Sequence, residues 1–295
     1  MGEYILSCCT TADISREHFE KRNISYICFH YSLNGRVYPD DLGQTMSIDD
    51  FYKEMEKGAD TSTSQVNVNE YEEYFGRFLE QGKDILHVTL SSGISGTYNS
   101  AEIAAAQMRE KYPGRKIIIV DSLAASSGFG LLMDELADRR DGGESMEDTA
   151  EWARTHRLLL NHWFFSTDLS YYIKGGRISK IPGMIGTVLN ICPVLDVDKD
   201  GRLQPRYKVR GKQRAIRRIE ELMEENAEDG LEYSGKCFIS QSACFEDARK
   251  LADLIESRFR RLKGKVLINH IGTTIGSHTG PGTVALFFWG RAARA

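Results

Sequence analysis

Residues Asp84 to Ser122 read DILHVTLSSGISGTYNSAEIAAAQMREKYPGRKIIIVDS and contain the clearest structural signal of the chain. This stretch begins and ends with short, mostly apolar runs, at 84–90 and 116–122, of the kind that are buried on both faces of a parallel sheet. A helical pattern occupies most of the segment between them, from Gly96 to Tyr112. A strand, a crossover helix and a second strand in this order predict a parallel α/β sheet.

The same alternation extends over the first half of the chain. Two further runs rich in β-branched and aromatic residues, at 4–9 and 24–33, predict strands. Further helices are expected at 48–57, 69–81, 123–139 and 145–160. We therefore expect an N-terminal parallel α/β domain over residues 1–160.

The second half of the chain predicts a different architecture. In PVLDVDKDGRLQPRYKVRG (193–211) a Lys-Asp-Gly turn separates two extended arms, which indicates a β-hairpin. Helical patterns at 212–227 and 245–262 alternate with strand candidates at 236–242, 265–272 and 283–290. Hairpins mixed with helices predict a C-terminal α/β domain over residues 161–295 with a mainly antiparallel sheet, and the domain boundary is expected near 155–165.

Composition and charge argue against several classes of protein. The 295 residues carry a formal net charge of −4, whereas nucleic-acid-binding proteins usually present a strongly basic face. The longest charge-free apolar run, Ile181–Leu195, contains two prolines and is too short to span a bilayer, so no stable membrane insertion is expected. The six cysteines form no C-x-x-C pair and no cluster with histidines, which predicts no metal site. Reduced cysteines and the lack of a signal-peptide pattern indicate a cytoplasmic protein.

Three hydroxyl-rich stretches fall where open α/β sheets bind ligands, beyond the carboxyl ends of strands. They are TSTSQ (61–65), SSGISGTYNSA (91–101) and DSLAASSG (121–128). Their side chains fit helix capping, but they also fit a shared pocket for a small anion, with Gly93 and Gly96 on either side of Ser95. Neither G-x-G-x-x-G nor G-x-x-x-x-G-K-[ST] is present, so a carboxylate is a better candidate for the anion than a nucleotide.

Two glycine-rich stretches of the second half are candidates to complete such a pocket. SHTGPGT (277–283) places His278 in a tight loop before an apolar strand, and KGGRIS (174–179) places Arg177 after two glycines at an expected strand end. A lone histidine also fits a purely structural role, and an arginine fits a solvated surface charge. The apolar run Ile181–Leu195 fits a buried core segment and the wall of a lipid tunnel equally well.

Taken in order, these motifs resemble the DegV family of fatty-acid-binding proteins, the carrier subunits of bacterial fatty acid kinase systems. The resemblance covers essentially the whole chain and includes Thr63-Ser64-Gln65, SSGISGTYNSA, KIIIVDS, YYIKGGRIS, VRGKQRA and HTGPGTVALFF. It implies two α/β domains, one buried long-chain fatty acid and no other cofactor. It also implies a partner, the fatty acid kinase catalytic subunit, which phosphorylates the bound carboxylate to an acyl phosphate.

The resemblance also assigns roles to individual residues. The implied ligand-binding residues are Thr63, Ser64, Ser95, Gly96, His278 and Thr279, with Ser64 as a donor to the carboxylate. Arg177 and Arg210 are implied as contacts of the head group or of the partner.

Two positions depart from the family pattern. Cys9 stands where many members have Asp, which puts the role of that Asp in fixing the loop or the domain interface in doubt. Val66 stands where Pro commonly follows Thr-Ser-Gln, which loosens a turn. Two other functions remain open on the sequence: an acyl-ester hydrolase with Ser95 as nucleophile and His278 as base, and a lipid-sensing regulatory protein.

Overall fold

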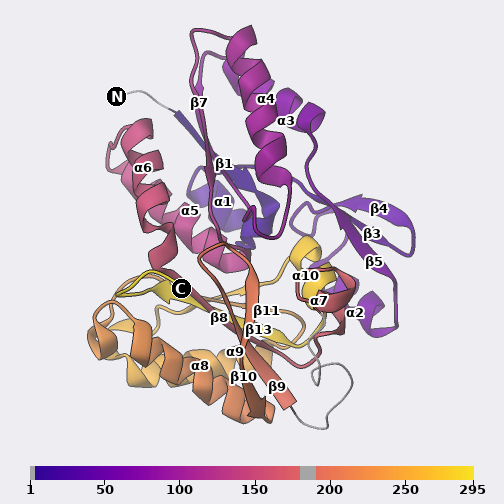
Figure 1. The fold of residues 1–295 in the computed structure, drawn as a ribbon, viewed down its shortest axis with the longest axis vertical. Helices are drawn as coiled ribbons and strands as arrows, with labels where there is room; N and C mark the ends of the chain where they lie inside the picture. Colours follow the sequence, from indigo (N-terminus) through magenta and orange to yellow (C-terminus); the bar gives the residue numbers. More distant parts are fainter. Residues whose placement is uncertain (1–3, 180–190) are drawn as a thin grey trace.

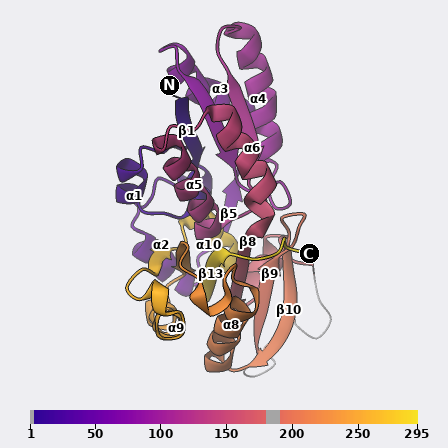
Figure 2. The same cartoon turned by 90° about the vertical axis from the view of Figure 1, so that its left-hand side faces the viewer.

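The computed structural model describes residues 4–179 and 191–295. Two large sheets form the two halves of the molecule, one above the other in Figure 1 and, after a quarter turn, in Figure 2. The first sheet is fully parallel, with the strand order β2-β1-β6-β7. Its strands are β1 (Tyr4–Cys9), β2 (Ser25–Ile27), β6 (Asp84–Thr89) and β7 (Ile117–Asp121).

Helices cover both faces of the parallel sheet, as the alternation of the sequence predicts. In Figure 1, α3 and α4 lie on one side of the sheet and α5 and α6 on the other. Side chains such as Phe75, Leu86 and Phe129 are fully buried between these layers. The helices of this half are α1 (Arg16–Lys21), α3 (Val68–Leu79), α4 (Thr97–Lys111), α5 (Ser126–Asp141) and α6 (Met146–His156).

The second sheet has the order β10-β9-β8-β13-β11-β12, and every pairing in it is antiparallel except β11 with β12. Helices α8 (Lys212–Asn226) and α9 (Phe245–Arg258) cover the face turned away from the parallel sheet (Figure 1). The predicted hairpin is present, because Gly201 takes the positive φ of +71° that its turn requires. The strands are β8 (Leu160–Ser166), β9 (Ile191–Val197), β10 (Leu203–Arg210), β11 (Cys237–Gln241), β12 (Leu267–His270) and β13 (Thr283–Trp289).

The prediction of one strand over 24–33 is wrong, because this segment contributes to two different sheets. Its first part is β2, whereas its second part, β3 (His30–Leu33), pairs with β4 (Arg36–Pro39) and β5 (Thr61–Ser64) in a small antiparallel sheet. The buried side chains of β3 pack on α2 (Ile48–Glu56) in a separate small core. TSTSQ therefore belongs mostly to a strand of this third sheet, and it does not follow a strand of the parallel sheet.

Two short helices replace predicted loops and strand ends in the second half. His278 lies in α10 (Thr273–Thr279), which ends at Gly280 with a φ of +67°. Arg177 follows α7 (Ser170–Lys174), so the expectation that it ends a strand is wrong. Both helices are too short for the 3.6-residue periodicity to be visible in the sequence.

Carboxylate and hydroxyl groups of the first half hold α10 in place. The Thr273 hydroxyl donates to Asp40 Oδ1 at 2.8 Å, and the backbone N–H of Thr274 donates to Oδ2 of the same carboxylate at 3.4 Å. The Tyr52 hydroxyl donates to the carbonyl of Ile271 at 2.9 Å. These contacts bring the helix that carries His278 against the N-terminal half.

Most of the cysteines are small buried residues of strands. Cys8, Cys9, Cys192 and Cys237 are buried strand residues, and all six cysteines are free. In the described ranges, no group of three or more potential ligands for a metal ion comes together. None of the helices within residues 4–179 and 191–295 has the length and hydrophobicity needed to cross a bilayer. Of the apolar run 181–195, residues 181–190 lie outside the described residues, and the rest belongs to β9.

Candidate ligand-binding site

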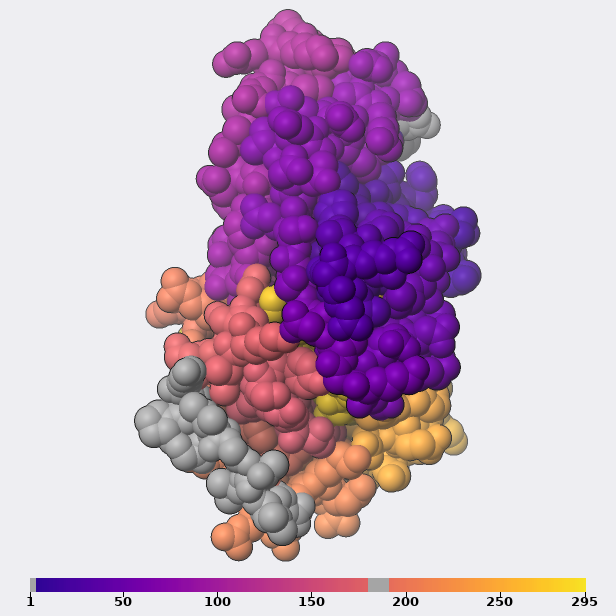
Figure 3. Space-filling model, turned by 90° about the vertical axis from the view of Figure 1, so that its right-hand side faces the viewer, coloured from indigo at the N-terminus to yellow at the C-terminus, as the bar shows by residue number. Residues whose placement is uncertain are grey.

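A cavity of about 380 Å³ lies between the two large sheets. The carboxyl edge of the parallel sheet, helix α10 and the inner face of the second sheet form its walls. The lining is mostly apolar, and the second sheet contributes Phe164, Val197, Leu203, Ala285 and Phe287. A mostly apolar cavity of this size with a few polar groups is typical of a small-molecule site. In Figure 3, a little of the yellow C-terminal segment is visible where the purple N-terminal half meets the rose segment.

One end of the cavity is polar, and it gathers most of the residues assigned from the sequence. Six of them line the cavity together: Thr63, Ser64, Ser95, Arg177, His278 and Thr279. They come from β5, the loop before α4, the turn after α7, and α10. Segments more than 200 residues apart therefore contribute to a single cluster of hydroxyl, imidazole and guanidinium groups.

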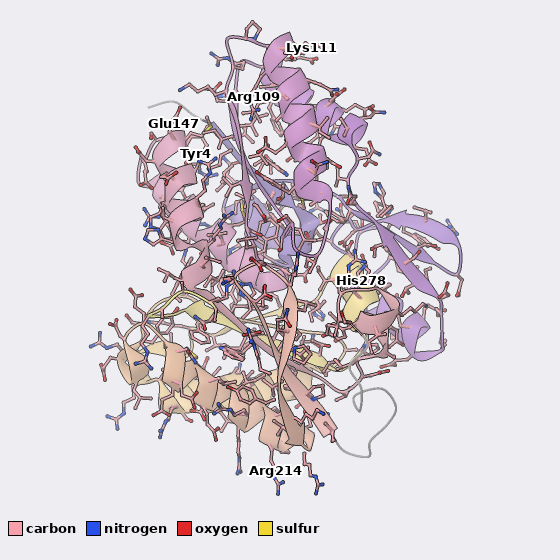
Figure 4. The ribbon with its side chains drawn as sticks, in the orientation of Figure 1. Tyr4, Arg109, Lys111, Glu147, Arg214 and His278 are labelled. Atoms are coloured by element: carbon pink, nitrogen blue, oxygen red, sulfur yellow. The ribbon has the colours of Figure 1, made fainter. Side chains whose placement is uncertain are left out.

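Two assigned residues lie elsewhere. Gly96 lines a neighbouring cleft of about 590 Å³, whose wall also includes the loop from Ser92 and the segment Arg202–Pro205. Arg210 is exposed at the end of β10 and lines neither hollow. Figure 4 shows Arg214, at the start of the next helix, pointing away from the molecule and far from His278. Arg210 is thus a surface residue, and its expected role as a partner contact stays a prediction.

The serine loop before α4 is held by its own backbone and by its glycine. Ser95 Oγ accepts a hydrogen bond from the backbone N–H of Thr97 at 3.2 Å, which fixes the hydroxyl at the helix start. A Cβ at Gly96 would lie 2.8 Å from the side-chain oxygen of Gln65, so the glycine lets this side chain pack against the loop. Gln65 in turn donates to Ser100 Oγ at 3.0 Å. The Thr-Ser-Gln segment and the serine loop are therefore joined directly.

His278 faces β5 through one ring nitrogen. Its Nε2 shares a hydrogen bond of 2.7 Å with Thr63 Oγ1, while its buried Nδ1 has no partner among the described residues. Gly175 lies against the ring, since a Cβ there would be 2.1 Å from Nδ1. Burial and the positive charge of Arg177 lower the pKa of His278 from 6.5 to about 4. The ring is therefore neutral at physiological pH in the free protein.

Arg177 is a cation without a carboxylate partner in the described part of the chain. Its guanidinium donates to the backbone carbonyls of Ile94, at 3.2 Å, and of Gly175. Burial lowers its pKa, because the charged form is poorly solvated there. Arg177 lines both the cavity and the neighbouring cleft. The polar end thus has an excess of positive charge, which favours an anionic ligand group.

The unusual Cys9 is connected to the same loop by hydroxyl groups. Its buried Sγ lies 3.3 Å from the hydroxyl of Tyr71, and that hydroxyl shares a 2.8 Å hydrogen bond with Thr97 Oγ1 at the start of α4. Burial raises the pKa of the Cys9 thiol to about 11, so the group is a neutral thiol. The position at which the sequence resemblance leads us to expect Asp is here a neutral, packed side chain behind the serine loop.

Several other polar groups that line the cavity were not assigned from the sequence, although Tyr172, Ser126 and Thr283 belong to motifs described above. Tyr172 and Thr283 share a 3.0 Å hydrogen bond. Ser126 and His162 also line the cavity, and the Ser126 hydroxyl donates to Asp13 Oδ2. Thr283 is the last residue of the SHTGPGT motif, so its closeness to His278 in the sequence could have marked it as a cavity residue. His162 stands in an ordinary strand sequence that marks nothing.

The comparisons with known proteins agree with this architecture. The family model described as an uncharacterised protein of the DegV family matches residues 10–291. A DegV domain-containing protein of Clostridium perfringens is 34% identical over 290 residues, which cover 98% of each chain. A DegV domain-containing protein of Lactococcus lactis is 34% identical over 287 residues, which cover 97% of each chain.

Solved structures with the same fold extend over the whole chain. A DegV lipid-binding protein of Thermotoga maritima is similar with a TM-score of 0.84 at 26% identity, and the match covers 100% of both chains. A second protein of that organism, described by its fatty acid binding function, has a TM-score of 0.82 at 26% identity, over 97% of this chain and 99% of its own. From the match of the family model and the identity to these relatives, the chain belongs to the DegV family.

Proposed function

We propose that this protein binds a long-chain fatty acid in the cavity between its sheets and presents the carboxylate to a separate kinase. The single observation that carries the proposal is the cavity itself, which combines a mostly apolar lining with a cluster of hydroxyl, imidazole and guanidinium groups. A fatty acid has the same division into chain and head group. The two Thermotoga maritima relatives described as lipid-binding and fatty-acid-binding support the same ligand class.

The acyl chain supplies most of the affinity in this proposal. Each buried methylene contributes about 0.8 kcal/mol, so about fourteen of them yield about 11 kcal/mol before the cost of association is subtracted. Hydrogen bonds to the charged head group contribute about 1.5–3 kcal/mol each, against a desolvation cost of similar size. The polar end therefore sets the orientation of the ligand more than its affinity.

The head group is held by hydroxyl groups, by the guanidinium of Arg177 and by the imidazole of His278. Thr63, Ser64, Ser95 and Thr279 provide hydroxyl groups, and the unpaired charge of Arg177 provides the counter-charge. A carboxylate near His278 stabilises the protonated ring, so binding raises the low pKa of this histidine and takes up a proton below neutral pH. Binding is accordingly stronger in mildly acidic solution.

The neighbouring cleft is the proposed place of phosphoryl transfer. It shares Arg177 and the serine loop with the cavity, and it begins at the N-terminus of α4, where Gly96 provides no side-chain cap. Backbone N–H groups at a helix start and an arginine both favour a phosphate. The sequence has no nucleotide-binding motif, so the nucleotide comes with the partner kinase, with exposed Arg210 as a docking contact.

Ligand content tests the first part of the proposal. Mass spectrometry of lipid extracted from purified protein should find a long-chain fatty acid in the wild type, and less of it in Ser95→Ala and His278→Ala. Ser92→Ala is the matched control, because Ser92 is exposed in the same loop and lines only the cleft. Wild-type protein that holds no acyl ligand and takes none up would refute the proposal.

Phosphorylation tests the second part. Loaded protein mixed with a fatty acid kinase catalytic subunit and ATP should form an acyl phosphate, which hydroxylamine traps as a hydroxamate. Arg210→Glu should slow this reaction without lowering the ligand content, since the side chain lies outside the cavity. Bound acid that no such kinase phosphorylates would instead favour the lipid-sensing function.

The geometry does not favour the hydrolase. A serine nucleophile requires a base within hydrogen-bond reach and a carboxylate that orients this base. Here Nε2 of His278 is paired with Thr63, and its Nδ1 has no partner within the described ranges. Generic acyl esters should accordingly not be turned over, and measurable Ser95-dependent turnover would reverse this conclusion.

A further inference from the structure

Tyr71 lies behind the serine loop, in the core of the N-terminal half. It belongs to α3, it is 0% exposed, and it lines neither the cavity nor the cleft. Its hydroxyl shares a 2.8 Å hydrogen bond with Thr97 Oγ1 in the first turn of α4, and Thr97 is also fully buried. A buried hydroxyl is tolerated only when it is paired, so this hydrogen bond holds the start of α4 against α3.

The hydroxyl of Ser95 is free to donate a hydrogen bond to a ligand. Its Oγ accepts from the backbone N–H of Thr97, and its proton has no acceptor among the described residues. A serine hydroxyl can donate one hydrogen bond while it accepts another, and Ser95 lines the cavity. A carboxylate only accepts hydrogen bonds, so it is suited to this proton. The N–H of Thr97 therefore determines how Ser95 is oriented towards the ligand.

The first turn of α4 depends on few side chains for its position. Its N-cap residue is Gly96, which is exposed and provides no side-chain cap. The hydrogen bond from Gln65 to Ser100 holds one side of the turn, and the hydrogen bond between Tyr71 and Thr97 holds the other. The second of these acts on the same residue whose N–H contacts Ser95.

We propose that Tyr71 is a positioning residue of the head-group site. By holding Thr97, it keeps the backbone N–H of that residue on Ser95 Oγ, and it thereby keeps the Ser95 proton available to the carboxylate. This inference rests on the proposed function, to which it adds a residue that does not touch the ligand. Loss of the Tyr71 hydroxyl leaves Thr97 Oγ1 buried without this partner, so the turn relaxes and recognition of the head group is weakened.

Two probes that differ only at the head group test the inference on the full-length protein. Octadecanoic acid carries a carboxylate, and octadecan-1-ol has the same number of carbons without it, so the ratio of their Kd values reports on the head-group site. In Tyr71→Phe the preference for the acid should fall by about three- to tenfold, which corresponds to one ordinary hydrogen bond. The Kd of the alcohol should stay within about twofold, because the wall around the acyl chain is unchanged.

Tyr74→Phe is the matched control. Tyr74 lies on the same helix, is 7% exposed, and shares a hydrogen bond of the same length, 2.8 Å, with Ser7. Ser7 leads on to His87, from which only a 3.9 Å contact reaches Cys9. Both variants should lower the midpoint of urea denaturation to a similar extent, but Tyr74→Phe should leave the ratio of the two Kd values unchanged. Equal losses of acid preference in the two variants would mean a merely structural role for Tyr71.

Variants of Thr97 and Ser95 test the route by which Tyr71 acts. Thr97→Val removes the hydroxyl and should reproduce the loss of acid preference, whereas Thr97→Ser keeps the hydroxyl and should restore it. This pair decides the question even if Tyr71→Phe does not fold, since equal ratios in the two Thr97 variants would contradict the inference.

In a Ser95→Ala background, Tyr71→Phe should cause no further loss, because a residue that acts through the Ser95 hydroxyl has no effect once that hydroxyl is gone. Additive losses, or a wild-type ratio in Tyr71→Phe, would overturn the inference and leave the proposed function standing. Failure of the wild type to bind octadecanoic acid would overturn both.

Discussion

The two neighbouring glycines after α7 allow a sharp test of His278 as a head-group ligand. Gly175 has an ordinary backbone conformation, but a Cβ there would lie 2.1 Å from Nδ1 of His278. Gly176 has the opposite properties: its φ is +70°, and a Cβ would meet nothing within 4 Å. Alanine at 175 therefore disturbs the histidine, whereas alanine at 176 disturbs only the backbone.

The size of each effect follows from the geometry. Real Cβ contacts essentially never fall below 3.0 Å, so in Gly175→Ala the ring has to move by about 1 Å, which breaks its 2.7 Å hydrogen bond to Thr63. Losing a hydrogen bond to the charged ligand weakens binding by about 1.5–3 kcal/mol, or about ten- to a hundredfold. Gly176→Ala should lower the free energy of unfolding by about 1–2 kcal/mol through its positive φ, and leave the Kd within about twofold.

Isothermal titration with a long-chain acid, together with urea denaturation of the ligand-free proteins, measures both quantities. The two variants should separate, one with weaker binding and the other with lower stability. The reasoning would be refuted if Gly175→Ala bound as tightly as the wild type while retaining its fold. It would also be refuted if Gly176→Ala lost affinity to the same extent.

Three further changes test other parts of the cavity and its polar end. Ala285→Leu places about three carbons in the cavity, so it should weaken the binding of a long-chain acid by about 2.4 kcal/mol and leave the binding of a short acid unchanged. It should also raise the melting temperature of the free protein. Equal losses of affinity for both acids would contradict this prediction. Thr63→Val leaves both nitrogens of His278 unpaired, so it should lower the free energy of unfolding, measured by urea denaturation, by about 1–3 kcal/mol. Ser62→Ala is the control and should not lower it, because Ser62 is the exposed neighbour of Thr63. Between pH 6.5 and about 4 the unfolded chain binds a proton that folded His278 does not, so stability falls as the pH drops through this window. His278→Gln should flatten that part of the thermal-denaturation profile, and an unchanged slope would contradict the low pKa.

Long elements with a clear period were predictable from the sequence. The apolar runs at 84–90 and 116–122 became adjacent parallel strands, since buried parallel strands tolerate few polar residues. The Lys-Asp-Gly turn became the β9–β10 hairpin because its glycine alone tolerates the required backbone angle. These signals are local, so the structures that they predict do not depend on contacts with distant segments of the chain.

The remaining features depend on contacts between distant segments. The segment 24–33 contributes to two sheets because Tyr31 and Leu33 pack against side chains of α2. No local pattern in this segment indicates that contact. Asp40 accepts a hydrogen bond from Thr273 at the start of helix α10, although the two residues are more than 230 positions apart in the sequence. The motifs predicted that His278 and Ser95 lie at one site, and both line the cavity. The position of His162 in the cavity wall depends on how the two sheets pack, so no local pattern could predict it.

On the proposed function, a cavity bounded by both halves of the chain makes the lifetime of the protein depend on the supply of its ligand. An acid present at a hundred times its Kd adds about 2.7 kcal/mol to the free energy of unfolding, because it binds only where both sheets are in place. Proteases attack the opened chain, so on the proposed function empty copies are degraded before loaded ones. The cellular stock of the carrier would then follow the amount of lipid available to carry, without a dedicated sensor.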